Sequence, residues 1–275
     1  MKGFHEEIIR EKVRNKLKND PNLFYKEPFL NYAGKTIDTK ELYTEVIADE
    51  LIANCSQVSQ IGKNASIRKS DNKSFNAHPH HIPNVTATLK KFKQLEYCEK
   101  LLAIALYNSN ERYCLGKILD YEVPLKENKS DKHGKIDLVS IIDDNKQSIK
   151  LIELKIKAKK GNDETLLRTL LEIYTYYKLI NNSYGKFLKD YKLSSDKYTR
   201  FQPAILTDKQ SLSGETLSNI KKHPRVQALI SEMNKEIDGQ IEGFVYDYPK
   251  RNEPFQEDEG HKIILQGNIT ITQVI

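Results

Sequence analysis

The segment KIDLVSIIDDNKQSIKLIELKIKAKKG, from Lys135 to Gly161, contains two short apolar runs that charged residues interrupt. Asp137 interrupts the first run, and Glu153 and Lys155 interrupt the second. Runs of Ile, Leu and Val of this length are typical of β-strands. A charge inside a strand that buries itself is costly unless the charge is paired, binds a metal or takes part in chemistry. Both the fold and the function therefore depend on what these three residues do.

The second run, at residues 149–158, has two different faces if it forms a strand. Side chains two residues apart point to the same face of a strand, so Glu153 and Lys155 share one face. Ile152 and Leu154 point to the other face, which is apolar. The strand thus presents one face to the core and a carboxylate beside an ammonium on the other.

The first run, at residues 135–142, can form a hairpin with the second. We predict that Asp137 lies directly opposite Glu153 in this hairpin. A one-residue shift would place Asp137 opposite Ile152 on the apolar face, where burial of a charge is costly. The predicted register requires a three-residue loop at Asp144–Lys146 or a β-bulge.

Asp137 and Glu153 would then converge at one end of the hairpin. Two converging carboxylates suit a hard divalent cation, which prefers oxygen ligands. They also repel each other, so at least one of their pKa values should be raised until a metal binds. Lys155 beside such a cation can orient a water molecule, help to deprotonate it or neutralise a phosphate. A metal and a lysine together supply an activated nucleophile and charge stabilisation, which phosphodiester hydrolysis requires.

The surrounding sequence predicts an ordered series of helices and strands. Periodic apolar residues predict helices at 89–107 and 164–180, and apolar runs predict strands at 121–125, 135–142, 149–158 and 201–208. The first three strands can form an antiparallel meander through short turns. The last strand requires a helical crossover, which gives a mixed sheet.

Further segments flank this series. A helix is expected at residues 4–18, and another from Asp38, because Asp38 and Glu41 resemble a capping box. One or two helices at 215–237 lead to strands at 241–248 and 262–274, which the sequence does not place. We divide the chain into an N-terminal helical extension and linker (1–82), a core (83–210), and C-terminal helices and strands packed on the core (211–275).

Asp137 within GKID and Glu153-Leu154-Lys155 as ELK, in this order of elements, resemble the PD-(D/E)xK nuclease superfamily, which includes restriction endonucleases and RecB-like nucleases. The resemblance covers roughly residues 88–208. In one departure, the aspartate follows an isoleucine rather than a proline. The resemblance implies an α/β fold with a restriction-endonuclease-like core.

The same resemblance implies Mg²⁺- or Mn²⁺-dependent hydrolysis of phosphodiester bonds, with DNA as the expected substrate. Asp137 and Glu153 would hold the metal, together with the backbone carbonyl of Leu154. Lys155 would position the attacking water. Members of the superfamily often dimerise to cut both strands, so a homodimer remains open.

Glu99 is a further candidate ligand and catalytic residue. It fills the gap in the apolar stripe of the first core helix, so it should face the sheet. The superfamily often has an acidic residue on this helix. The alternative is that Glu99 is partly buried and paired with a lysine or a tyrosine. The stripe consists of Phe92, Leu95, Leu102 and Leu106.

Several basic residues follow the ELK motif. We expect Lys157, Lys159, Lys160 and Arg168 to contact phosphates, although a solvated strand edge would also explain the lysines. Tyr176 joins them because Glu172-x-x-x-Tyr176 is similar to the Q-x-x-x-Y motif of RecB-like members. An Arg168–Glu172 ion pair within the helix is the alternative explanation for that spacing.

The composition agrees with a nucleic-acid partner but does not require one. The chain has 275 residues, of which 38% are hydrophobic and 30% are charged, and a formal net charge of +6. No apolar run approaches the roughly 18 residues of a membrane span, and the N-terminus does not resemble a secretory signal. Three scattered cysteines predict free thiols in a reducing, cytoplasmic location.

Two hypotheses of other classes compete with a nuclease. The chain could be a nucleic-acid-binding module of the same fold without activity. It could also be a structural or partner-binding protein in which Asp137, Glu153 and Lys155 form cross-strand salt bridges on the solvent face of a surface hairpin.

Overall fold

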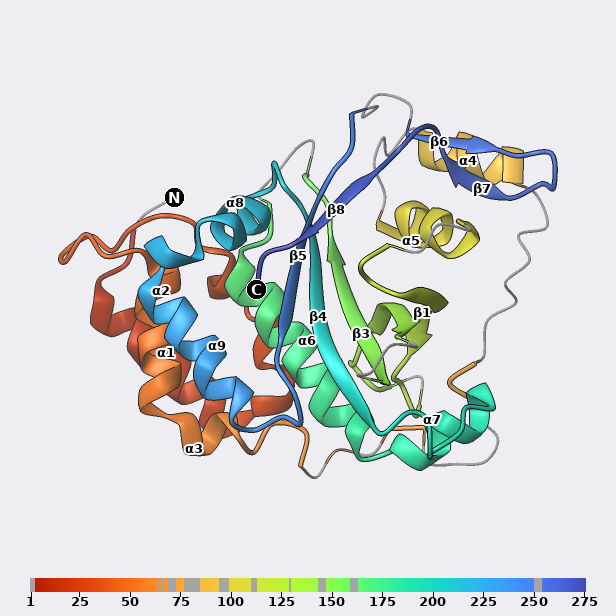
Figure 1. Ribbon diagram of the computed structural model, residues 1–275. Helices are drawn as coiled ribbons and strands as arrows, with labels where there is room; N and C mark the ends of the chain where they lie inside the picture. Colours follow the sequence, from red (N-terminus) through yellow and green to blue (C-terminus); the bar gives the residue numbers. More distant parts are fainter. Residues whose placement is uncertain are drawn as a thin grey trace.

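The computed structural model describes residues 3–63, 65, 67–68, 73–76, 85–93, 99–109, 113–128, 130–142, 147–158, 163–249 and 254–275 (Figure 1). Its α-helices are α1 (Glu6–Asn19), α2 (Tyr43–Ala53), α3 (Cys55–Val58), α4 (Val85–Lys93), α5 (Glu99–Asn108), α6 (Leu166–Asn181), α7 (Tyr184–Tyr191), α8 (Leu212–Ser218) and α9 (Pro224–Asn234). Its 3₁₀ helices are η1 (Pro21–Lys26), η2 (Pro28–Asn31) and η3 (Ile220–Lys222). Its strands are β1 (Lys117–Pro124), β2 (Lys135–Ile141), β3 (Ser148–Lys155), β4 (Arg200–Asp208), β5 (Glu242–Asp247), β6 (Phe255–Glu257), β7 (Ile263–Leu265) and β8 (Thr270–Gln273).

Six strands form one mixed sheet in the order β1-β2-β3-β4-β5-β8. β1, β2 and β3 are antiparallel neighbours, and β4 joins β3 in parallel after the crossover through α6 and α7. The predicted α/β class and mixed sheet are therefore confirmed, and the predicted order of helix, three strands, helix and strand is present. The strands that the sequence did not place extend this sheet: β5 lies parallel to β4, and β8 is antiparallel to β5.

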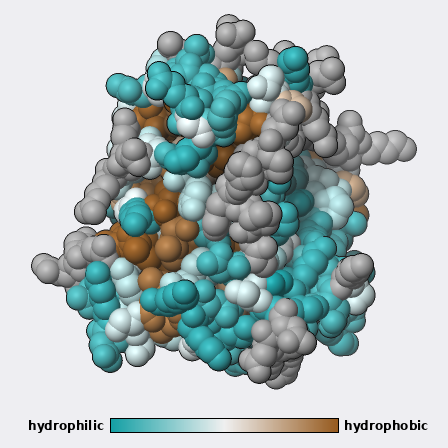
Figure 2. All heavy atoms as spheres, turned by 90° about the vertical axis from the view of Figure 1, so that its right-hand side faces the viewer, coloured by the Kyte–Doolittle hydropathy of each residue, from teal (hydrophilic) through white to brown (hydrophobic). Residues whose placement is uncertain are grey.

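Helices cover both faces of the sheet (Figure 1). One face packs on a hydrophobic cluster that includes residues of α1, α2, α6 and α9, and it contributes Leu151 and Ile205 to that cluster. The other face contributes Ile152 and Leu154 to a second cluster with α4 and α5. Seen from the side of α4 and α5, some hydrophobic side chains reach the surface between hydrophilic ones (Figure 2). Because both faces are covered, every residue of β3 is buried.

The β2–β3 register is the one that the sequence predicted. Leu138 pairs with Ile152, and Ile141 pairs with Ile149. Continued by one residue, this register sets Asp137 opposite Glu153. The turn at residues 143–146, where we predicted a three-residue loop or a bulge, lies outside the described residues.

One helix prediction needs correction. α2 begins at Tyr43 rather than at Asp38, and its N-cap is Leu42. The Asp38 carboxylate instead accepts hydrogen bonds from the backbone N–H of Glu6, at 3.0 and 3.3 Å, in the first turn of α1. The predicted helix at 89–107 is covered by α4 and α5 except at residues 94–98, which lie outside the described residues.

Within the described residues, no helix is long and apolar enough to cross a membrane. Cys55 and Cys114 are free thiols, as predicted, and Cys98 lies outside the described residues.

Candidate functional site

A group of acidic residues surrounds one lysine at the carboxyl end of β3. Glu153 and Lys155 are only 2% and 7% exposed, so neither lies on a solvent face as the surface-hairpin hypothesis requires. Five carboxylates act electrostatically on this lysine or on one another. We call them the acidic centre, and they belong to Glu99, Asp137, Glu153, Glu164 and Glu172.

The Lys155 ammonium is the cation at the middle of this group. Its Nζ lies 2.6 Å from Oε1 of Glu153, 3.4 Å from Oε2 of Glu164 and 3.5 Å from Oε2 of Glu172. Burial lowers the pKa of Lys155, but the surrounding carboxylates outweigh this effect and raise the pKa well above its ordinary value. Lys155 is therefore a permanent ammonium at neutral pH.

Backbone amides hold two of the other acids. Asp137 Oδ2 accepts a hydrogen bond of 2.8 Å from the backbone N–H of Leu154. This contact joins the aspartate of β2 to the middle residue of the ELK motif on β3. Glu99, at the start of α5, is partly buried and interacts with Lys155 and with the backbone N–H of Ile156. The structure thus brings all four predicted catalytic residues to one place.

Asp137, Glu153 and Glu99 are harder to ionise than ordinary carboxyls. Burial, followed by the charges of other acids, raises the pKa of Asp137 to about 7 and that of Glu153 well above its ordinary value. Burial also raises the pKa of Glu99. The predicted direction is therefore confirmed, but burial is the largest cause and mutual repulsion, which was the predicted cause, is smaller.

The donor set suits a hard divalent cation. Oε2 of Glu153 is buried and has no hydrogen-bond partner among the described residues, and the centre has more carboxylates than cations. Carboxylate oxygens are the preferred ligands of Mg²⁺ and Mn²⁺. As the described side chains stand, no three His, Cys, Asp or Glu residues already form a metal-binding group. The acids gather around the Lys155 ammonium instead.

α6 contributes a polar stripe with a spacing of four residues. Arg168 Nε pairs with Oε1 of Glu164 at 3.1 Å, so the predicted Arg168–Glu172 pair is wrong. Glu172 interacts with Lys155 and accepts a 2.8 Å hydrogen bond from the Tyr176 hydroxyl. The four-residue spacing predicted the stripe from Arg168 onward; Glu164, which was not predicted, lies one more step of four toward the N-terminus.

The predicted phosphate contacts have different outcomes. Lys157 is exposed and Arg168 is partly exposed, as such contacts require, whereas Lys159 and Lys160 lie outside the described residues. Tyr176 is 2% exposed, so the prediction that it contacts nucleic acid is corrected. Its hydroxyl is used inside the protein to hold Glu172.

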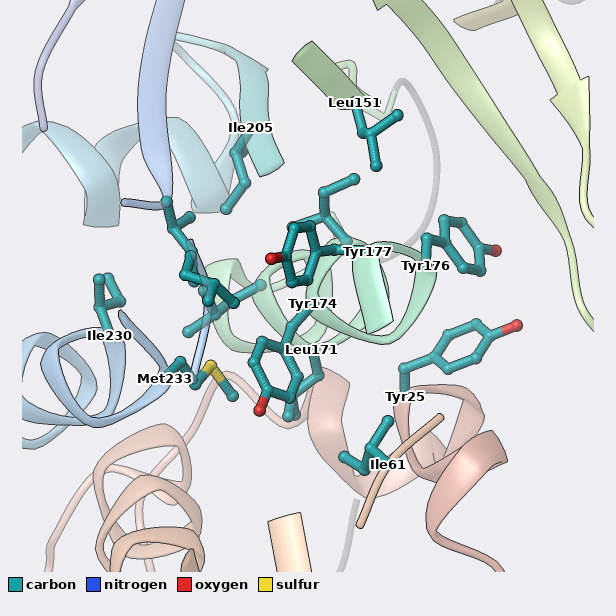
Figure 3. Packing of buried hydrophobic residues seen from close by; sticks show 14 of the residues in the cluster. Tyr25, Ile61, Leu151, Leu171, Tyr174, Tyr176, Tyr177, Ile205, Ile230 and Met233 are labelled. Carbon is teal, nitrogen blue, oxygen red and sulfur yellow. The ribbon is translucent and has the colours of Figure 1, made fainter. Parts of the chain in front are cut away.

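Replacing Tyr176 with phenylalanine should lower the free energy of unfolding by about 1–2 kcal/mol, because the Glu172 carboxylate loses a buried donor. Tyr174 on the same helix provides the matched control, since its buried hydroxyl has no hydrogen-bond partner among the described residues (Figure 3). Tyr174→Phe should leave the stability unchanged or slightly increase it. Urea unfolding of both variants measures the difference, and equal effects would contradict the role given to Tyr176.

No protein-family profile, curated protein or solved structure matches this chain.

Proposed function

We propose that this protein is a metal-dependent nuclease that hydrolyses phosphodiester bonds, with DNA as its substrate. The observation that supports this proposal is the position of Asp137 opposite Glu153, with the buried ammonium of Lys155 beside them. A structural hairpin has no need to gather five acids, all of them partly or fully buried, around one lysine, because buried charges are costly unless they are fully paired.

Asp137 and Glu153 are the proposed metal ligands, helped by Glu99 and by the backbone carbonyl of Leu154. A bound Mg²⁺ or Mn²⁺ would lower the pKa of a water molecule and neutralise charge on the phosphate. The buried, unpartnered Oε2 of Glu153 is the chain's clearest free ligand atom among the described residues.

The raised pKa of Lys155 excludes one of the roles that the sequence allowed, that of the base. Because its pKa is raised, it keeps its proton at neutral pH and does not serve as the base in this state. It can donate hydrogen bonds to the attacking water and to a phosphate oxygen. Glu164 and Glu172 hold its ammonium from the α6 side, at 3.4 and 3.5 Å. We therefore assign Lys155 to orientation and charge stabilisation.

A plasmid-nicking assay with Mg²⁺, Mn²⁺ or EDTA tests this proposal. We expect cutting with either metal, no cutting in EDTA, and a loss of at least about 10²-fold in Lys155→Ala, the scale seen when one preorganised stabilising group is removed. Lys189→Ala is the control, because this lysine is exposed on α7, away from the acidic centre.

The same assay separates the competing hypotheses. DNA binding without cutting would favour an inactive binding module, and neither binding nor cutting would favour a structural protein. Cutting that persists in EDTA or in Lys155→Ala would contradict the metal site and the role of Lys155.

A further inference from the structure

The N-terminal extension reaches the acidic centre through η1. The Tyr25 ring packs edge-on against the Tyr176 ring, with ring centroids 5.4 Å apart. The hydroxyls of Tyr25 and Tyr176 point toward the same side in Figure 3. The Tyr176 hydroxyl donates its hydrogen bond to Glu172 of the acidic centre. Lys26 directly follows Tyr25 and extends over its ring, 5.5 Å from the centroid. η1 precedes the core segment at residues 83–210, and it places the exposed ammonium of Lys26 beside the catalytic candidates.

The β1–β2 loop lies against the same segment. The Lys26 ammonium donates a hydrogen bond to the backbone carbonyl of Lys132 in this loop. At the end of the loop, a Cβ on Gly134 would lie only 2.2 Å from the Tyr176 hydroxyl, so glycine allows the loop to approach α6 this closely. The loop also leads directly into β2 and Asp137.

Hydrogen bonds anchor the described residues of this loop. The Asp131 carboxylate accepts from the backbone N–H groups of Glu127 and Asn128, both at 2.8 Å. Arg68 donates to the backbone carbonyl of Lys126 at 3.1 Å. Lys126 and Lys132 are therefore exposed side chains on an anchored loop rather than on a loose one.

The cations of these two segments lie within electrostatic reach of one another. Partial burial lowers the pKa of Lys26, and Lys126, Arg168 and Lys132 lower it further, whereas Glu172 raises it. Among the described residues, no carboxylate forms an ion pair with Lys26, Lys126 or Lys132. Three lysines without an ion pair among the described residues, beside a metal-suited centre, favour an anionic partner.

We propose that Lys26, Lys126 and Lys132, which we call the basic rim, bind the phosphate backbone of DNA next to the acidic centre. This inference rests on the proposed nuclease function and assigns to η1 the task of holding the strand that is cut. The contacts are to phosphates, so they position the substrate without reading its sequence. The N-terminal extension is thereby part of the substrate site.

Fluorescence anisotropy with a labelled DNA duplex in EDTA tests the basic rim without cutting. In Lys26→Gln, Kd at low salt should rise roughly three- to tenfold, and the slope of log K against log salt should become shallower by about 0.9, the value for one lost phosphate contact. The double variant Lys126→Gln/Lys132→Gln should lose about twice that slope. Lys222→Gln is the matched control, because this lysine is exposed on η3, which packs against α8 and α9, and its Kd and slope should not change.

The outcomes are distinguishable from those of the nicking assay. Lys26→Gln and Lys222→Gln with equal slopes, or a wild-type protein that does not bind DNA at low salt, would overturn the basic rim even if the protein cuts DNA. A selective effect of the rim variants with unchanged unfolding curves supports it. If the rim variants show that selective effect but the wild-type protein cuts nothing with either metal, the basic rim stands and the nuclease proposal fails.

Discussion

In EDTA, Asp137→Asn is expected to be more stable than the wild-type protein at pH 8 and about equally stable near pH 4. The pKa of Asp137 is raised from 3.8 to about 7 in the folded protein, mainly by burial. An acid with a raised folded pKa contributes stability that is fully present below its unfolded pKa and is lost as the pH rises through the folded one. The relevant window is therefore about pH 4 to 7, and above it the wild-type protein keeps a buried carboxylate that asparagine avoids.

The expected difference at pH 8 is on the order of a few kcal/mol, since one pKa unit corresponds to about 1.4 kcal/mol. Asparagine can still accept the hydrogen bond from the Leu154 amide through its side-chain oxygen. Comparing the two proteins at each pH cancels titrating groups that Asp137 does not influence, such as His133, whose lowered pKa acts in the opposite direction. Lys155 titrates far above this window and is constant across it.

Divalent metal should reverse the order of the two proteins. Metal binds the ionised carboxylates, so Mg²⁺ or Mn²⁺ should stabilise the wild-type protein increasingly as the pH rises through 7. Asp137→Asn lacks one proposed ligand and should gain little. Thermal unfolding with and without metal provides the measurement. A wild-type protein that is indifferent to metal at pH 8, or a variant that is less stable in EDTA at that pH, would speak against the site.

The sequence predicted the parts of this site that depend on local periodicity. The two-residue period of a strand places Glu153 and Lys155 on one face, and the cost of burying a charge fixes Asp137 opposite Glu153. The structure bears out both inferences. Glu99 could be found because it interrupts an apolar helical stripe.

The missing parts depend on contacts between segments that are distant in the sequence. Tyr25 and Lys26 belong to a short 3₁₀ segment with no periodic pattern, and only packing against α6 brings them to Tyr176. The partner of Arg168 was wrong for a related reason. Two glutamates stand four residues away from Arg168, one on each side, and Lys155 contacts both of them. The spacing in the helix therefore does not decide between them, and Arg168 pairs with Glu164.

The Glu153→Gln variant should best distinguish a catalytic role of the Glu153 carboxylate from a role in folding. We expect metal-dependent cutting to fall by about 10³-fold or more, because the variant lacks a carboxylate that the proposed metal site needs and an amide is a weak ligand for a hard cation. In EDTA at pH 8 the unfolding midpoint should stay the same or rise, since one of five crowded acids loses its charge. Lys155 keeps Glu164 and Glu172 as partners.

These opposite effects are not expected of a purely structural ion pair, whose loss lowers stability and has no direct effect on chemistry. Glu11→Gln on the exposed side of α1 is the matched control and should change neither quantity. Cutting rates and Mn²⁺ titration calorimetry, measured on the same samples as unfolding, check the prediction. If Glu153→Gln cuts DNA at the wild-type rate, Glu153 is not a metal ligand. If it loses cutting only because it no longer folds, the carboxylate is a structural partner of Lys155 and the acidic centre holds the fold together.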